Sequence, residues 1–383
     1  MFDKYGAEKI VKLYLEKYDL LKSIQPREDG SLPDVGGACD LKSMLNIYIE
    51  PTNLCNLSCV FCARENMRRG TMHLRLDGFQ RALRDLPAGS YITMTGNGEP
   101  LLNPDIYEMI ASASGAGMYV SMITNATALN ERNQDRLIDS GVSRVQISFQ
   151  SLDRDTYGAI MRNANFERTL ENVLGFIKKV REREKKIFIS ISTVKVKEGE
   201  KYAAVSKRFW EKMPIDNYYE GELLSLQSDS AEYEQCVIDE QEEYLPCANP
   251  WIDVKINADG AVIPCVQDFS CKYTIGNIYK NTLLEILNGE EAKRFRCASL
   301  HGDMEFLDKI GYHCGQCNTW REKVGGSIGY FLEKSFPIRL GLVVDEIAGG
   351  RPGNTEFLER VLAYLKSGGT DVLTQFRDEL RED

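Results

Sequence analysis

The sequence predicts an α/β fold in which six strand–helix units form a parallel sheet that closes partway into a barrel. The main observation is a series of β-rich runs, the sixth weaker than the others, at residues 45–50, 91–95, 118–123, 145–149, 187–194 and 217–224. Helical segments follow the runs, and in residues 104–113, 130–140 and 166–179 the apolar side chains recur every three or four residues. Repeated units of this kind build a parallel sheet through right-handed crossovers.

Composition narrows the class of protein. The 383 residues are 43% apolar, which suits a large catalytic domain with a smaller second one. The net charge of −10 disfavours binding to nucleic acid, which needs clustered Lys and Arg, and no apolar stretch is long enough to span a membrane. The 11 cysteines are too few for a disulfide scaffold, and the chain does not begin like a secretion signal. We therefore expect a cytoplasmic protein whose reduced thiols bind metal.

Cys55, Cys59 and Cys62 form a C-x3-C-x2-C motif directly after the first predicted strand. Three thiolates can hold a 4Fe-4S cluster and leave its fourth iron without a protein ligand. A structural zinc site would need a fourth ligand, and the nearest candidate after the motif is His73; a group of buried thiols without metal is a further alternative. In barrels of this type the chemistry gathers at the carboxyl ends of the strands, where this motif lies.

The motif resembles that of the radical S-adenosylmethionine (radical SAM) enzymes, and Phe61 matches the aromatic residue that usually precedes the third cysteine in this superfamily. The resemblance extends over residues 43–225. It implies a TIM-like partial (β/α)6 barrel in which the open iron binds the amino and carboxylate groups of SAM. It also implies an electron donor of the flavodoxin or ferredoxin type.

Three later loops resemble the superfamily as well. Gly96–Pro100 resembles its Gly-Gly-Glu-Pro segment, Thr124–Thr127 its Thr-Asn-Gly-Thr loop and Ser148–Gln150 its Ser-x-Asp. The residues that the resemblance assigns to SAM are Gly96, Asn97, Gly98, Glu99, Thr124, Asn125, Ser148, Gln150 and Arg162.

These loops also depart from the superfamily pattern. Asn97 and Ala126 stand where glycines are usual, and Gln150 replaces an acid, which argues against proton transfer there. Without the resemblance, the glycine segment would be read as a tight turn, and Ser148 and Arg162 as surface capping or ion-pairing residues.

A second set of cysteines lies further along the chain: Cys247, Cys265, Cys314 and Cys317. A hairpin of strands at residues 251–256 and 261–264, with its turn at Asp259-Gly260, would bring Cys247 and Cys265 together. This would suit a zinc ribbon or a fully ligated iron–sulfur cluster. Beside a radical SAM motif, this spacing resembles the auxiliary-cluster half of a SPASM or twitch domain. Because no cysteine follows Cys317, we expect a single auxiliary cluster and two 4Fe-4S clusters in all, with Cys271 as an alternative ligand.

The sequence divides into five expected segments. They are an N-terminal helical extension (1–42), the radical SAM barrel (43–225), a linker (226–246), a SPASM or twitch domain (247–322) and a helical C-terminal extension (323–383). In the N-terminal segment, residues 8–24 have the pattern of an amphipathic helix that packs on the barrel. Thr355 and Thr370 are expected to N-cap two helices near the C-terminus.

The resemblance implies an enzyme that cleaves SAM reductively and removes a hydrogen atom from its substrate. We expect a small polar metabolite of sugar or aminocyclitol type, dehydrogenated or epimerised in natural-product biosynthesis, because the chain shows no separate N-terminal peptide-recognition domain. The alternatives are a maturase that epimerises or crosslinks a ribosomally made peptide, and a non-catalytic metal-binding scaffold. Cys236 belongs to neither cysteine set and is either a hydrogen-atom donor for epimerisation or a small core residue.

Overall fold

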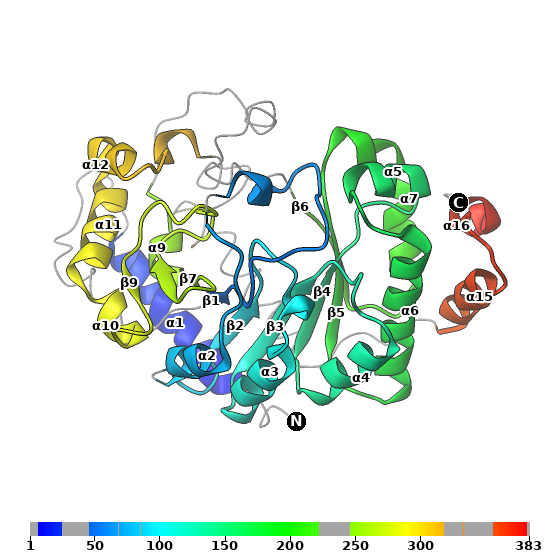
Figure 1. Cartoon of the computed structure of the whole chain (residues 1–383), viewed down its shortest axis with the longest axis horizontal. Helices are drawn as coiled ribbons and strands as arrows, with labels where there is room; N and C mark the ends of the chain where they lie inside the picture. Colours follow the sequence, from blue (N-terminus) through cyan, green and yellow to red (C-terminus); the bar gives the residue numbers. More distant parts are fainter. Residues whose placement is uncertain are drawn as a thin grey trace.

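One continuous sheet joins the two predicted domains (Figure 1). The computed structural model describes residues 7–24, 46–67, 69–84, 86–221, 246–317, 332 and 355–380. Within these residues the sheet has nine strands in the order β6-β5-β4-β3-β2-β1-β7-β8-β9. Cys236 and the rest of the expected linker before residue 246 lie outside the described residues.

The first six strands form the expected parallel barrel sheet. They are β1 (Asn46–Ile49), β2 (Tyr91–Met94), β3 (Tyr119–Thr124), β4 (Arg144–Ser148), β5 (Phe188–Val194) and β6 (Asn217–Gly221). Each pairs in parallel with the next, with Ile49 opposite Met94 and Thr124 opposite Ile147. The free edge of β1 pairs with β7 and not with β6, so the barrel stays open. The prediction of a partial barrel is therefore confirmed.

Helices follow the strands and cover the outer face of the sheet (Figure 1). They are α2 (Leu76–Leu83), α3 (Ile106–Gly115), α4 (Glu131–Asp139), α5 (Arg154–Ile160), α6 (Phe166–Glu182) and α7 (Glu200–Glu211). Short 3-10 turns also occur in this part of the chain, at Ala63–Asn66, Pro100–Leu102 and Lys197–Gly199. Asn130 and Asn165 begin α4 and α6, where their side chains accept hydrogen bonds from the backbone N–H groups of Asn133 and Arg168.

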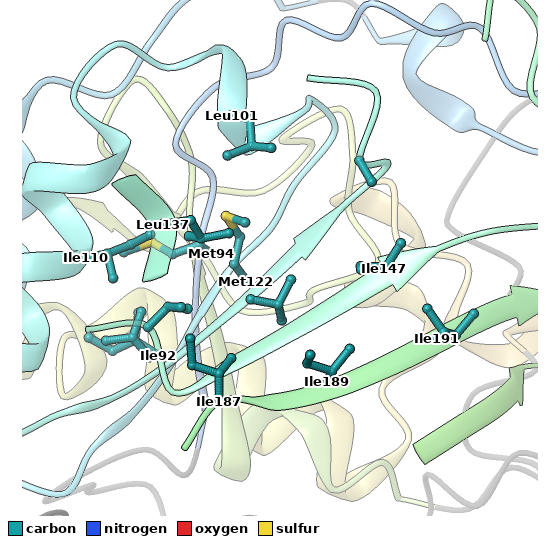
Figure 2. Packing of buried hydrophobic residues seen from close by; sticks show 14 of the residues in the cluster. Ile92, Met94, Leu101, Ile110, Met122, Leu137, Ile147, Ile187, Ile189 and Ile191 are labelled. Carbon is teal, nitrogen blue, oxygen red and sulfur yellow. The ribbon is translucent and has the colours of Figure 1, made fainter. Parts of the chain in front are cut away.

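Alternate residues of the strands divide between two environments. Ile92, Met94 and Met122 are fully buried and face Ile110 of α3 and Leu137 of α4 in the apolar layer (Figure 2). Successive side chains of a strand point to opposite faces, so the residues between these apolar ones face the barrel interior. Near the carboxyl ends of β3, β4 and β5, interior residues such as Ile123, Gln146 and Ser192 line the site described below.

The second domain adds a hairpin to the edge of the barrel sheet. Its elements are α9 (Asn249–Ile252), β7 (Asp253–Ile256), β8 (Ala261–Ile263), β9 (Gly276–Asn277), α10 (Leu283–Leu287), α11 (Glu290–His301), α12 (Met304–Lys309) and a 3-10 turn at Cys314–Gln316. Strand β7 runs parallel to β1, with Val254 opposite Ile47, and β8 returns antiparallel. Gly260 makes the turn between β7 and β8 at a φ of +78°, which favours glycine.

The start of this hairpin differs from the prediction. Trp251 and Ile252 were expected in the strand, but they form the short helix α9. Pro250 stands at the first turn of α9, where proline fits a helix, and both apolar side chains are fully buried. The two residues therefore contribute to the core from a helical turn, which the apolar pattern alone could not distinguish from a strand.

The terminal helices pack on opposite parts of the molecule (Figure 1). Helix α1 (Ala7–Ile24) contacts α9, beside the second domain, whereas α15 (Thr355–Lys366) packs on α6 of the barrel. After α15 come α16 (Val372–Gln375) and a 3-10 turn at Arg377–Leu380. The predicted cap at Thr370 is one residue early, since the side chain of Asp371 accepts the hydrogen bond from Thr374 N. None of the helices among the described residues has the length and apolar character needed to cross a membrane.

Candidate active site

A cavity of about 600 Å³ opens at the carboxyl ends of all six barrel strands. Each strand or the loop after it contributes to the wall, for example through Cys55, Thr95, Thr124, Ser148, Val194 and Gly221. This is the edge at which parallel barrels collect catalytic residues. All of the cysteines of the first motif line the cavity, together with eight of the nine residues that the sequence assigned to SAM.

The three cysteines of the first motif lie close together in the wall of the cavity. Burial raises the pKa of Cys59 to about 12, and the neighbouring thiols Cys62 and Cys55 act in the same direction. The loop is held in place because Val60 N donates to the Ile160 carbonyl at 3.0 Å. A thiol with a raised pKa is protonated at neutral pH, and bound iron would displace its proton. A set of three converging thiols fits a 4Fe-4S cluster with one open iron.

The four cysteines of the second set also converge. Burial raises the pKa of Cys265 well above its usual value, and Cys317, Cys314 and Cys247 raise it further. Among the described residues, no three Cys, His, Asp or Glu side chains are arranged to hold a single metal ion. A 4Fe-4S cluster differs from a single ion because it binds each cysteine through a different iron. Four neighbouring cysteine thiols therefore provide the number and kind of ligands that a fully ligated 4Fe-4S cluster needs.

Cys271, the alternative ligand, occupies a different setting. Its thiol lies 3.3 Å from the hydroxyl of Thr274, and either group can donate. Burial raises the pKa of this thiol, and the nearby Asp259 and Asp268 carboxylates add to the effect. Its backbone has a φ of +58°, which side chains other than glycine seldom adopt. Cys271 as a ligand remains a prediction.

Glu99 ties the loop after β2 to the loop after β3. Its Oε1 accepts hydrogen bonds from Thr124 Oγ1 at 2.7 Å and from Leu101 N at 3.1 Å, and its Oε2 accepts from Asn125 N at 2.8 Å. Burial raises the pKa of Glu99, although these hydrogen bonds oppose the shift. A carboxylate can accept about four hydrogen bonds, so Oε2 keeps room for one more. An ammonium group in the cavity would satisfy it.

The two glycines before Glu99 let this loop approach the cysteine loop. A Cβ atom on Gly96 would lie 2.6 Å from Glu50 Cγ, and one on Gly98 would lie 2.3 Å from the carbonyl oxygen of Thr52. Glu99 N can then donate to the carbonyl of Leu54 at 2.8 Å. The sequence predicted glycines here for close approach to a ligand, and the structure adds a close approach of backbone to backbone.

Asn97 and Ala126, which replace glycines of the superfamily pattern, differ in how the chain accommodates them. Ala126 keeps a glycine-like φ of +57° and is fully buried. Asn97 is also buried, and its Nδ2 donates to the Phe269 carbonyl at 2.9 Å. Phe269 belongs to the second domain, so Asn97 connects the glycine loop of the barrel to that domain.

The loops after β4 and β5 position two further predicted residues. Gln150 is buried, and its Oε1 accepts hydrogen bonds from Val194 N at 2.9 Å and Thr193 Oγ1 at 3.1 Å. Ser148 lines the cavity, whereas the side chain of Arg162 is exposed and is not part of the cavity wall. The backbone carbonyl of Arg162 nevertheless accepts from Ser58 N at 3.2 Å in the cysteine loop. Roles in SAM binding for these residues remain predictions.

The cavity contains polar residues that the sequence reasoning missed. Gln146 of β4, Ser192 of β5, and Tyr219 and Glu220 of β6 all line it. The alternation of residue types along β4 could have revealed Gln146, because Gln146 and Ser148 alternate with the buried Val145 and Ile147. No such alternation marks β6, where the pattern was weak.

The family models agree with this geometry. The model of the radical SAM superfamily matches residues 49–197, and the SPASM model of an iron–sulfur cluster-binding domain matches residues 247–318. The chain contains a radical SAM domain and a SPASM domain. These domains imply 4Fe-4S clusters and SAM, so the prediction of these cofactors is confirmed.

Relatives with curated descriptions match about a third of the chain. The chain is 30% identical over 140 residues to a probable GTP 3′,8-cyclase of Methanothermobacter marburgensis, covering 36% of this chain and 45% of that protein. It is 33% identical over 108 residues to the PqqA peptide cyclase of Rhodopseudomonas palustris, covering 28% of this chain and 29% of that protein. The chain thus matches less than half the length of these relatives.

Solved structures resemble the fold over more of the chain. SuiB of Streptococcus suis, bound to its precursor peptide SuiA, is similar with a TM-score of 0.55 and 16% identity, covering 68% of this chain and 69% of SuiB. The enzyme anSMEcpe with bound AdoMet is similar with a TM-score of 0.51 and 15% identity, covering 87% of this chain and 97% of anSMEcpe. At these identities the likeness concerns the fold alone.

Proposed function

We propose that this radical SAM enzyme removes a hydrogen atom from a small polar metabolite of sugar or aminocyclitol type. The outcome is dehydrogenation or epimerisation of that metabolite in natural-product biosynthesis. The observation that carries the proposal is the polar wall of the cavity on the side of β4 to β6, where Gln146, Ser192 and Glu220 offer amide, hydroxyl and carboxylate groups. Such groups can hydrogen-bond the hydroxyl and amino substituents of a cyclitol or sugar.

Different residues around the cavity have different proposed roles. A reduced cluster with bound SAM supplies a carbon-centred radical, and the protein supplies binding, orientation and exclusion of water. Cys55, Cys59 and Cys62 would hold the cluster, and the remaining acceptor site of Glu99 Oε2 would accept from the SAM ammonium group. Glu220, on β6, would orient the substrate. An electron donor of flavodoxin or ferredoxin type would supply the electron.

The test is anaerobic SAM cleavage with a panel of aminocyclitols and sugars, in which 5′-deoxyadenosine is measured. We expect at least one compound to raise its formation above the substrate-free rate. The matched control is the variant with Cys55, Cys59 and Cys62 replaced by Ala, which should lose about four irons per chain and all SAM cleavage. Continued 5′-deoxyadenosine formation in that control would refute the assignment of the SAM site.

A ribosomally made peptide is the second candidate substrate. The identity of 33% to a PqqA peptide cyclase, although limited to 108 residues, favours it. The same panel should therefore include short peptides encoded by neighbouring genes. Stimulation of 5′-deoxyadenosine formation by such a peptide, with no response to any cyclitol or sugar, would decide for a maturase.

The outcome of the reaction depends on Cys236, which lies outside the described residues. If Cys236 donates a hydrogen atom to the substrate radical, the product is an epimer, and product formed in heavy water carries a solvent deuterium. Cys236→Ala would then still form 5′-deoxyadenosine but yield no inverted product. A ketone without deuterium, made equally well by the variant, would decide for dehydrogenation.

A further inference from the structure

Lys255 is a buried cation between the SAM cavity and the auxiliary cysteines. The residue lies on β7 and is only 3% exposed. Its Nζ lies 3.4 Å from Asn97 Oδ1 in the glycine loop and 4.7 Å from the centre of the Phe269 ring. Among the described residues, no carboxylate lies within ion-pair distance of this ammonium group. Burying a charge without a direct counter-ion is unfavourable, so the position of Lys255 calls for a function.

The carboxylates near Lys255 are already engaged with other groups. Glu50 forms a two-point ion pair with Arg69, with N···O distances of 2.9 and 2.7 Å. The Oδ2 atom of Asp268 accepts from the Tyr312 hydroxyl at 2.8 Å and from Lys272 N at 2.7 Å. Among the described residues, Lys255 therefore has no carboxylate of its own, and its ammonium group contacts the Asn97 side-chain oxygen and the Phe269 ring.

The auxiliary site can supply the missing negative charge. Burial lowers the pKa of Lys255, and the charge of Arg69 acts in the same direction, while the charges of Glu50 and Asp268 oppose that shift. Strand pairing places Lys255 opposite Ile263 in the β7–β8 hairpin, and Cys265 follows Ile263 by two residues, so Lys255 lies near the four converging thiols. A 4Fe-4S cluster with four cysteine ligands carries a net negative charge that grows by one on reduction. A fixed cation nearby stabilises the reduced form more than the oxidised form.

We propose that Lys255 is a positioning residue that acts as the counter-charge of the auxiliary cluster and raises its reduction potential. The effect would favour transfer of one electron from the substrate radical to the oxidised cluster. The cluster would then be reduced, and the oxidised substrate would release a proton to solvent. Asn97 holds the ammonium group on the side that faces the SAM cavity. The inference rests on the cluster assignment of the proposed function but not on the identity of the substrate.

The test is a redox titration of the auxiliary cluster, followed by electron paramagnetic resonance. It uses the full chain with Cys55, Cys59 and Cys62 replaced by Ala, so that the auxiliary cluster alone is observed. Lys255→Met, which is similar in size but uncharged, should lower the equilibrium constant for reduction roughly tenfold. That change corresponds to a potential about 59 mV more negative for a one-electron couple.

Two controls separate charge from packing. Lys280→Met removes an exposed charge from the same domain and should leave the potential unchanged, because water and salt screen exposed charges. Lys255→Arg keeps the charge and should stay close to the parent potential. An unchanged potential in Lys255→Met, or an equal drop in Lys255→Arg, would overturn the proposal.

Poor cluster loading is also informative. Cluster loss in Lys255→Met and Lys255→Gln, with retention in Lys255→Arg, would support the role as a counter-charge. Cluster loss in all three variants would assign Lys255 to packing and overturn the proposal. The titrated chain performs no SAM cleavage, so these results do not depend on substrate chemistry. A parent without any iron–sulfur signal would refute the auxiliary cluster and this inference together, while leaving SAM cleavage by the barrel to its own assay.

Discussion

Replacing Asn97 by Gly would restore the glycine of the superfamily pattern and should nevertheless destabilise this chain. Asn97 is 3% exposed, and its side chain joins the barrel to the second domain. Its Nδ2 donates to the Phe269 carbonyl at 2.9 Å and lies 3.3 Å from Met67 Sδ, while its Oδ1 accepts from Lys255 Nζ at 3.4 Å. Glycine removes all three contacts.

The expected loss of stability can be worked out from the buried groups that lose a partner when Asn97 becomes Gly. The Phe269 carbonyl loses a well-formed hydrogen bond, and an unsatisfied buried group costs about 1–3 kcal/mol. The contact to Lys255 is long, so its loss adds about 1 kcal/mol or less, and the greater freedom of a glycine backbone in the unfolded chain adds about 0.5–1 kcal/mol. We expect a loss of about 1.5–5 kcal/mol in the free energy of unfolding.

The assay is denaturant unfolding of the cluster-loaded chain under anaerobic conditions. Asn163→Gly is the matched control, because Asn163 is exposed and has a φ of +73°, which glycine adopts without strain. The control should change the unfolding free energy by less than about 0.5 kcal/mol. If Asn97→Gly were as stable as that control, the connection through Asn97 would be energetically unimportant and our reasoning wrong.

Three further predictions test other parts of the molecule. Replacing Cys314 and Cys317 by Ala should lower the iron content from about eight to about four per chain while some SAM cleavage remains; loss of zinc instead would refute the auxiliary cluster. Glu220→Gln should raise KM for the substrate with little change in SAM cleavage without substrate, and an unchanged KM would remove Glu220 from the substrate site. Burial pushes the pKa of Glu50 up, but the Arg69 hydrogen bonds and the Lys255 charge outweigh it and lower that pKa. The ionised Glu50 carboxylate therefore stabilises the folded state at any pH above the ordinary pKa of Glu. This stabilisation is lost as the pH falls through the lower pKa that Glu50 has in the folded state. The metal-free Glu50→Gln variant should therefore lose less stability than the parent between neutral and acidic pH, and an identical pH dependence would contradict this.

The sequence by itself determined the elements and the chemistry. Strand alternation, helix periodicity and the two cysteine sets are local patterns, and local patterns are what a single sequence can report. The six predicted strands appear within a few residues of their expected bounds, and the cysteines of each set lie together. The loops after the strands could be assigned to one site, because parallel strands bring their carboxyl ends to the same edge.

Only the tertiary structure decided how the two domains are joined. The pairing of β1 with β7 brings Ile47 opposite Val254, and this pairing links segments about 200 residues apart in the chain. No periodicity in either segment specifies that partner, since pairing depends on which edges remain free once the barrel has formed. The same pairing carries Lys255 next to Asn97, so a charged residue on a strand became a buried group between two cofactor sites. Arg162 is the opposite case. Its place in a sequence motif predicted a contact with SAM, but in the folded structure its side chain is exposed. Long-range pairing and burial depend on the whole chain, and for that physical reason they had to come from the folded structure.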